Sequence, residues 1–267
     1  MPTAAEIAPH IKGASLIALC SPLNPTGTTF KKEELEAICD LVIAENESRP
    51  AGAKKLYLMY DQIYWTLTYG DTKHYNPVSL RPKMKEYTVF VDGISKAFAA
   101  TGVRVGWSMG PADLITKMRS LNSHVGSWAP MAEQKAVAKF LAQDHAVASY
   151  LSHFRDEIEY RLQHIYKGFK QLKGEGFPVD AIIPQAAIYL TVQINLAGRK
   201  TANGRVLENQ EAVTEYVLNE AKLALVPFGI FGAGKENNWY RLSVGTCRKQ
   251  DIETVILKLR EALQKIQ

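Results

Sequence analysis

Four short segments of the chain carry side chains suited to chemistry. They are Asn24-Pro25-Thr26-Gly27, Asp61-Gln62-Ile63-Tyr64, Ser95-Lys96 followed by Gly102-Val103-Arg104-Val105-Gly106, and Tyr240-Arg241-Leu242-Ser243. Most of them stand at the end of a predicted strand or in the loop that follows it. In an open α/β sheet, that edge is where ligands bind. The four segments are therefore more informative together than one by one.

Lys96 is the candidate nucleophile. It follows the apolar run TVFVD and lies among small residues, so we expect it to be partly desolvated. A desolvated lysine loses its proton more readily and can then attack a carbonyl as an amine. The alternative is a solvated lysine at the start of a helix, which is the commoner situation for an isolated lysine.

Asp61 and Arg104 are the candidate charged partners of a ligand. Asp61 ends an apolar strand, where a carboxylate needs a cation or several hydrogen bonds, although a helix-capping or turn role is the simpler alternative. Arg104 is predicted to lie inside a strand between Gly102 and Gly106. A guanidinium there favours a carboxylate or phosphate ligand, or an internal ion pair.

The elements that position these residues are predicted to alternate between strands and helices. Short apolar runs predict strands at 15–20, 55–60, 88–92 and 103–109, with a helix over 31–45. The polar segments 45–55 and 69–83 are interpreted as surface connections. The pattern indicates an α/β fold with a mostly parallel sheet flanked by helices.

The second half of the chain has a different order of elements. Residues 111–173 are predicted to be helical, with one helix over 145–172 that is long enough to bridge two domains. A smaller α+β unit is predicted from strands at 179–183, 188–194, 223–226 and 239–244 and helices at 209–222 and 249–266. We therefore predict two domains, 1–150 and 151–267.

Composition excludes several classes of protein. The 267 residues are 46% hydrophobic and 22% charged, which excludes disorder, collagen-like repeats and a disulfide-stapled miniprotein. A net charge of +5, scattered along the chain, gives no support to nucleic-acid or membrane-surface binding. Three widely spaced cysteines indicate free thiols and no metal site, and no apolar run is long enough for a membrane span. We expect a cytoplasmic protein.

The ordered set of segments resembles the class I/II aminotransferases, which use pyridoxal phosphate and share the type I fold of such enzymes. NPTG, D-x-x-Y, S-K, G-x-R-x-G and the final R-L-S occur in the order of that family and at spacings that fit it. The likeness is to aspartate aminotransferases and covers the chain from about Ser15 onward. It implies that 1–150 is the remainder of a large cofactor-binding domain and 151–267 the small C-terminal domain.

The resemblance also implies roles for individual residues. Lys96 would form the internal Schiff base with pyridoxal 5′-phosphate and move the proton between the substrate Cα and the cofactor. Asp61 would pair with the pyridine nitrogen, which makes the ring an electron sink. Asn24 and Tyr64 would hydrogen-bond the phenolic oxygen of the ring.

Three further residues would bind anionic groups. Ser95 and Arg104 would hold the phosphate, and Arg241 would bind the α-carboxylate of an L-amino acid or a 2-oxo acid. Asn24 is expected to contact the substrate as well as the cofactor. The family's site usually lies between two copies of the chain, so a homodimer is implied. The specificity for the amino-acid side chain is left open.

The chain departs from the family pattern in places. Gly93 stands where relatives often have a serine that binds phosphate, and Gln62 stands where Glu is common. Family members are also considerably longer, so the resemblance implies that the N-terminal part of the large domain is lacking. Whether Met1 is the true start is left open.

Other activities are weighed against transamination. The same residues support lyase chemistry, such as β-elimination or decarboxylation, and a truncated chain without catalytic activity is a further alternative. Gly229 to Lys235 imitates a nucleotide-binding P-loop, but Glu236 replaces the Ser or Thr that must hold magnesium. We therefore expect this segment to be a loop that precedes the strand of Arg241.

Overall fold

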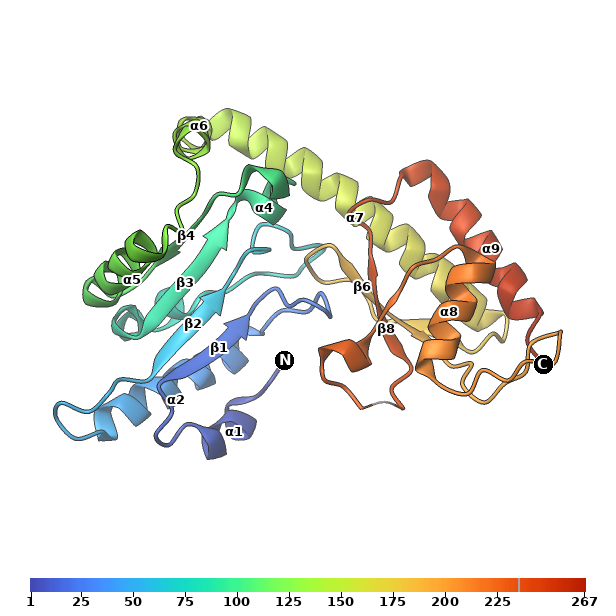
Figure 1. Ribbon diagram of the computed structural model, residues 1–267, viewed down its shortest axis with the longest axis horizontal. Coiled ribbons are helices and arrows are strands. Elements are labelled where there is room, and N and C mark those ends of the chain that lie inside the picture. The colour runs from blue at the N-terminus through green and yellow to red at the C-terminus, as the bar shows by residue number, and fades with distance from the viewer. Residues whose placement is uncertain (235) are drawn as a thin grey trace. The chain divides into compact units, whose positions relative to one another are not determined.

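The first sheet has four strands in the order β1-β2-β3-β4 (Figure 1). The computed structural model describes residues 1–234 and 236–267, and in it these strands are Leu16–Cys20, Tyr57–Asp61, Thr88–Gly93 and Gly106–Met109. β1, β2 and β3 are parallel, whereas β4 is antiparallel to β3. The predicted α/β fold with a mostly parallel sheet is confirmed. Because parallel strands end at one edge, the residues that follow β2 and β3 begin side by side.

Helix α2 (Lys32–Ser48) covers one face of this sheet, behind β1 and β2 in Figure 1. Its buried side chains recur at three- and four-residue spacing: Leu35, Ile38, Cys39 and Val42. They share one core with Leu58 and Tyr60 of β2. This apolar layer fixes the strands whose ends carry Asp61 and Lys96.

The predicted helical region from 111 to 173 consists of three helices. They are α5 (Ala112–Val125), α6 (Met131–Leu141) and α7 (Asp144–Gly174). Shorter helices are α1 (Ala4–Ile7), α3 (Pro77–Leu80) and α4 (Ile94–Ala97), with 3₁₀ turns at Ala8–His10, Pro82–Glu86 and Thr101–Val103.

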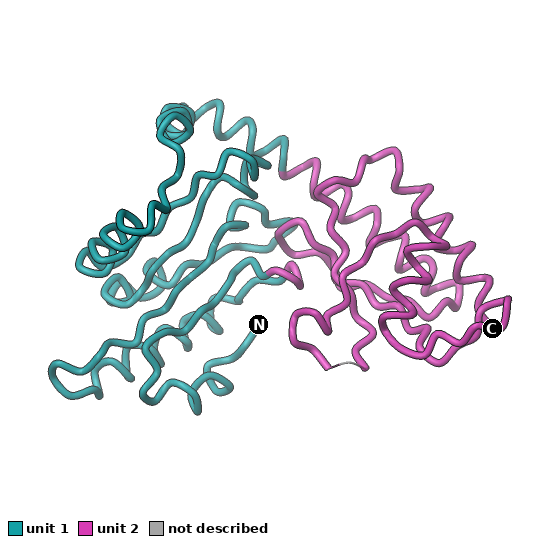
Figure 2. Tube along the Cα trace, viewed as in Figure 1, with its two compact units in different colours: residues 1–23, 28–154 teal, residues 24–27, 155–267 magenta. Residues whose placement is uncertain are grey.

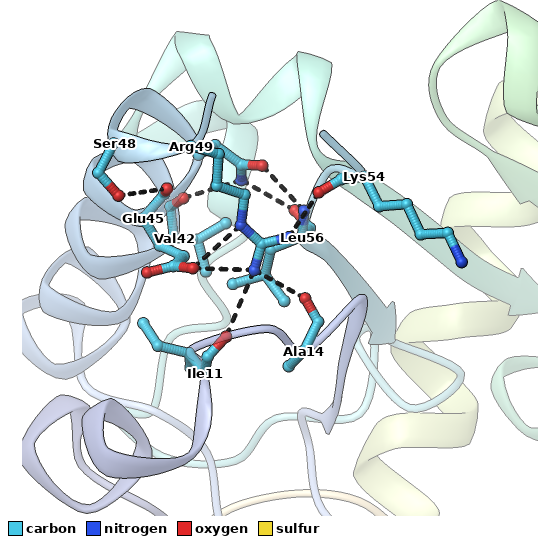
Figure 3. A network of polar contacts seen from close by, with 9 residues as sticks. Ile11, Ala14, Val42, Glu45, Ser48, Arg49, Lys54 and Leu56 are labelled. Carbon is cyan, nitrogen blue, oxygen red and sulfur yellow. Dashed lines mark hydrogen bonds and ion pairs between the residues drawn. The ribbon is translucent and has the colours of Figure 1, made fainter. Parts of the chain in front are cut away.

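The segment 45–55 does more than connect elements on the surface, so its interpretation as a surface connection is wrong in part. Residues 45–48 are the last turn of α2, and Arg49 donates to the carbonyl oxygens of Ala14 (2.7 Å) and Lys54 (2.6 Å) (Figure 3). Asn46 bonds both the N–H and the C=O of Leu56, at 2.8 and 2.9 Å. These bonds fix the chain just before β1 and β2, at the amino ends of these strands, whereas Asp61 lies at the carboxyl end of β2.

A second sheet, entirely antiparallel, has the order β5-β6-β8-β7. Its strands are β5 (Val179–Ala181), β6 (Tyr189–Ile194), β7 (Val226–Pro227) and β8 (Trp239–Ser243). Helix α8 (Gln210–Ala221) contacts β7 and packs against helix α9 (Ile252–Gln264), and 3₁₀ turns lie at Phe228–Phe231 and Lys249–Asp251. Gly168 of α7 lies so close to Ile256 of α9 that an added Cβ would meet it at 2.6 Å. This is the smaller second sheet predicted for the C-terminal part.

The chain divides into two compact units (Figure 2). Unit 1 comprises Met1–Leu23 and Thr28–Phe154, and unit 2 comprises Asn24–Gly27 and Arg155–Gln267. Helix α7 therefore contributes residues to both units. The domain division at 1–150 and 151–267 stays a prediction. Among the described residues, no helix has the length and apolar character needed to cross a membrane.

Candidate active site

The carboxyl ends of β2 and β3 bring Asp61 and Lys96 to one edge of the first sheet. Asp61 is the last residue of β2 and lies in register with Cys20 of β1 and Val91 of β3. Lys96 is half-buried in α4, the short helix that begins directly after β3. Parallel pairing of the strands therefore gathers the candidate carboxylate and the candidate amine at the ligand-binding edge.

The turn after β2 carries Tyr64. The Ile63 N–H donates to Asp61 Oδ1 at 3.0 Å, so one carboxylate oxygen organises this turn. The Tyr64 side chain is 3% exposed. Asp61 therefore does stabilise a turn, as the alternative interpretation expected. Ligand binding is still possible, because the second carboxylate oxygen can accept from a ligand.

The prediction that Arg104 lies inside a strand is wrong. Residues Thr101–Val103 form a 3₁₀ turn, Arg104 has a left-handed backbone with φ of 62°, and β4 begins only at Gly106. A strand requires extended backbone, and the left-handed residue ends the turn before pairing begins. The sequence gives no sign of this because Arg104 is bracketed by apolar residues of strand-like composition.

Arg104 nevertheless lies at the same edge as Lys96. Gly106 pairs with Gly93 across antiparallel β4 and β3, so the start of β4 adjoins the end of β3. The exposed guanidinium donates to the Thr101 carbonyl at 2.8 Å. No carboxylate in residues 1–234 and 236–267 pairs with it, so the internal ion pair considered for Arg104 is wrong. The charge is available to an anion.

Gly93 has a structural reason to lack a side chain. A Cβ at this position would stand 2.9 Å from both the Gly106 Cα and the Val105 carbonyl oxygen. The backbones of β3 and β4 approach too closely for a serine there. Ser95 therefore remains the hydroxyl of this turn, and its own carbonyl accepts a hydrogen bond from Thr101 at 3.1 Å.

Unit 2 holds the other two predicted residues, Asn24 and Arg241, in direct contact. Arg241 on β8 donates from Nη1 to Asn24 Oδ1 at 2.8 Å. Its guanidinium carbon lies 4.7 Å from the ring centroid of Tyr189 and 5.1 Å from that of Phe231. Its Nε is buried and has no hydrogen-bond partner. The side chain is thus held in place while one buried donor stays unsatisfied.

The segment Asn24–Gly27 is attached to β6 by close backbone contacts. The Thr191 hydroxyl donates to the Thr26 carbonyl, and the Ala186 N–H donates to the Gly27 carbonyl, both at 2.9 Å. Gly27 has φ of +69°, and a Cβ there would stand 2.6 Å from the Tyr189 carbonyl oxygen. Only glycine fits, which is the physical reason for the last residue of the NPTG segment.

Comparison with known proteins decides the family. The family model described as "Aminotransferase class I and II" matches residues 3–259. The chain belongs to this family. The aspartate aminotransferase of Pinus pinaster is 33% identical over 255 residues, covering 94% of this chain and 49% of that protein. A probable aspartate/prephenate aminotransferase of Rhizobium leguminosarum bv. phaseoli is 29% identical, covering 92% of this chain and 56% of that protein.

Solved aminotransferase structures share the fold. The aspartate aminotransferase of Rhizobium meliloti superposes with a TM-score of 0.83 at 22% identity, covering 100% of this chain and 62% of that one. The aromatic aminotransferase of Pyrococcus horikoshii gives 0.83 at 25% identity, with 99% and 64% covered. The chain spans about half the length of the curated aminotransferases that it matches.

Sequence reasoning did not single out three residues that adjoin the candidate positions. Tyr189 and Phe231 flank Arg241, and Asp92 is a buried carboxylate one residue before Gly93. A polar residue that ends an apolar strand, as in TVFVD, was the available signal for Asp92. No local pattern indicates an aromatic residue that meets an arginine from another strand.

The segment that resembles a P-loop, which begins at Gly229, is not followed by a helix. Phe228–Phe231 is a 3₁₀ turn, and the chain from residue 236 leads directly into β8, while Lys235 lies outside the described residues. As predicted, the segment precedes the strand of Arg241. Within the described chain, no group of three or more His, Cys, Asp and Glu side chains forms a metal site.

Proposed function

We propose that this chain forms the catalytic core of a pyridoxal-phosphate-dependent transamination between an L-amino acid and a 2-oxo acid. The proposal rests mainly on the surroundings of the Arg241 guanidinium. Its guanidinium is oriented by Asn24 and two aromatic rings, lacks a carboxylate partner in the described chain, and keeps a buried Nε unsatisfied. Such a group favours a planar anion that accepts two hydrogen bonds, which is what an α-carboxylate provides.

The residues at the sheet edge of unit 1 fit pyridoxal phosphate. Lys96 would hold its aldehyde carbon, Asp61 its ring nitrogen, and Ser95 with the unpaired Arg104 its phosphate. Tyr64 and Asn24 would donate to the ring oxygen. When bound, the cofactor supplies an electron sink for the charge that develops at the substrate Cα.

The chain's own residues then perform the remaining work. Arg241 would bind the substrate carboxylate and orient the Cα–H bond, and the Lys96 amine would take the proton from Cα and carry it to the cofactor. Asp61 keeps the ring nitrogen protonated. Aspartate, named for the pine and Geobacillus stearothermophilus relatives, is the first amino donor to test.

Absorption spectroscopy tests the cofactor site. The purified chain with added pyridoxal phosphate should develop a visible absorption band that borohydride bleaches. Lys96→Ala should abolish the band and the trapped adduct while the fold survives, and replacement of the exposed Lys117 by alanine should change neither. Absence of the band from the wild-type chain would refute the proposal, and an adduct that persists in Lys96→Ala would show that a different lysine binds.

Product analysis separates transamination from lyase chemistry. With aspartate and a second 2-oxo acid, transamination transfers the amino group and forms a new amino acid. Release of ammonia, or release of carbon dioxide while the amino group stays on the carbon skeleton of aspartate, would favour a lyase. The homodimer and the cytoplasmic location stay predictions, as does the role of residues 1–150 as the cofactor-binding domain.

A further inference from the structure

Asp92 is a buried carboxylate that none of the roles above uses. It lies at the end of β3 and its side chain is 7% exposed. Asp92 Oδ1 accepts from the Gly93 N–H at 2.7 Å, and Oδ2 accepts from Gln62 Nε2 at 3.2 Å. The Trp65 side chain is a third donor. Three donors converge on one buried group.

These contacts join the two turns that carry the chemistry. Gln62 and Trp65 belong to the turn after β2, between Asp61 and just past Tyr64. Gly93 begins the turn after β3, which continues into Ser95 and Lys96. The backbone adds a bond here, from the Gln62 N–H to the Val91 carbonyl at 3.0 Å. The Asp92 carboxylate thus accepts from side chains of the first turn and from the backbone at the start of the second turn. It thereby links the two turns.

We propose that Asp92 is a positioning residue that holds the Tyr64 turn and the Lys96 turn in register for the cofactor. The inference rests on the proposed function for its consequence, but its geometry is independent of any cofactor. It requires an ionised carboxylate, because all three neighbouring groups donate and only a carboxylate accepts on both oxygens.

Burial works against the ionised form of Asp92, and the three donors work in its favour. Burial raises the pKa of the Asp92 carboxyl, with nearby Asp61 adding to the rise, while the bonds from Gly93, Gln62 and Trp65 act against it. An amide at position 92 whose oxygen still accepts from Gly93 would turn its N–H₂ group toward Gln62 Nε2, so the bond would persist only if the Gln62 amide rotated to present its oxygen. Removing the charge alone should therefore loosen the contact between the turns.

An exchange of the two groups should restore the contact. Gln62 and Asp92 form an amide–carboxylate pair in which the amide donates and the carboxylate accepts. In the double variant Gln62→Glu/Asp92→Asn, the carboxylate introduced at position 62 would accept from the amide introduced at position 92. The oxygen of that amide would still accept from the Gly93 N–H. The pair would keep one carboxylate and one amide in reversed positions.

The test compares Asp92→Asn, the exchange variant and Asn46→Ala. Asn46 bonds Leu56 just before β2, at the amino ends of the parallel strands, so its loss lowers stability without touching either turn. The measurements are the dissociation constant of pyridoxal phosphate from the visible band and the NMR resonance of the Trp65 indole N–H without cofactor.

We expect Asp92→Asn to weaken cofactor binding by about ten-fold and to shift the indole resonance. The exchange variant should return binding to within about three-fold of wild type, and Asn46→Ala should change neither measurement. Wild-type behaviour of Asp92→Asn in both would overturn the proposal. So would an equal loss of binding in Asn46→Ala, because that loss would follow stability alone.

Two outcomes keep this test separate from the proposed function. If the wild-type chain forms no visible band, the proposed function fails, and the Trp65 indole resonance alone tests the positioning role of Asp92. A shift in Asp92→Asn that the exchange variant reverses supports that role. The absence of a shift overturns it. If Asp92→Asn is insoluble, a soluble exchange variant with wild-type binding supports the role, and an equally insoluble one overturns it.

Discussion

At Arg241, three contacts orient a guanidinium without neutralising it. Asn24 takes one N–H, and the rings of Tyr189 and Phe231 lie within 5.1 Å of the charged carbon. Aromatic faces attract a cation but leave its in-plane donors free. An arginine built in this way is prepared for a carboxylate, whereas one in a salt bridge would have to exchange partners first.

Replacing Arg241 by lysine should therefore impair substrate binding more than stability. The ammonium keeps the charge but loses the planar fork and the stacking, so we expect the affinity for the amino acid to fall by roughly 10- to 100-fold. Isothermal titration and thermal unfolding check the two effects. The matched control is Arg199→Lys, because Arg199 is exposed. An unchanged affinity in Arg241→Lys would show that Arg241 does not bind the substrate carboxylate.

His74 should make the protein less stable in acid. Both ring nitrogens are buried without partners, beside the rings of Tyr60 and Trp65, and burial lowers the pKa of His74 to about 4. The unfolded chain takes up a proton near pH 6.5 but the folded chain does not, so stability is full above pH 6.5 and falls between pH 6.5 and 4. The loss contributed by His74 reaches about 3 kcal/mol at most.

Chemical denaturation at several pH values measures this loss. The variant His74→Phe keeps an aromatic ring and cannot protonate, so its free energy of unfolding should fall less than that of wild type between about pH 7 and pH 4. Parallel curves for the two proteins would show that His74 does not titrate in this way.

Among the elements, most of the site-bearing strands follow from apolar runs. β1, β2, β3, β6 and β8 lie where such runs predict them, because each is a short segment with a buried face. Two expectations fail for physical reasons. Residues 103–105 are apolar enough for a strand but include the left-handed Arg104, and the strand predicted at 223–226 shrinks to Val226–Pro227 because its pairing with β8 covers only two residues.

The junction between Asn24–Gly27 and β6 gives a prediction at the same scale. Gly27→Ala should lower the free energy of unfolding by roughly 2 to 4 kcal/mol, since it adds both backbone strain and a clash with the Tyr189 carbonyl. Gly198→Ala is the control, because Gly198 has φ of +83° but nothing within 4 Å of an added Cβ. Equal losses in the two variants would show that the close approach is unimportant.

For the whole molecule, the sequence predicts the fold class but not how the candidate residues are grouped. The order of motifs indicates one site, and the structure gathers Asp61, Tyr64, Ser95, Lys96 and Arg104 in unit 1 and Asn24 with Arg241 in unit 2. Asn24 lies shortly after β1 and yet belongs with residues beyond 155. Such grouping depends on long-range contacts, as between Thr26 and Thr191, which no local pattern encodes.

The two edge strands of the first sheet have a practical consequence for anyone who handles this protein. Within residues 1–234 and 236–267, β1 and β4 each pair with one neighbouring strand, and their side chains include Leu16 and Met109, which are 54% and 49% exposed. Such edges can pair with strands of other molecules. Light scattering at increasing protein concentration should therefore show association, and charged side chains introduced on these edge strands should reduce it.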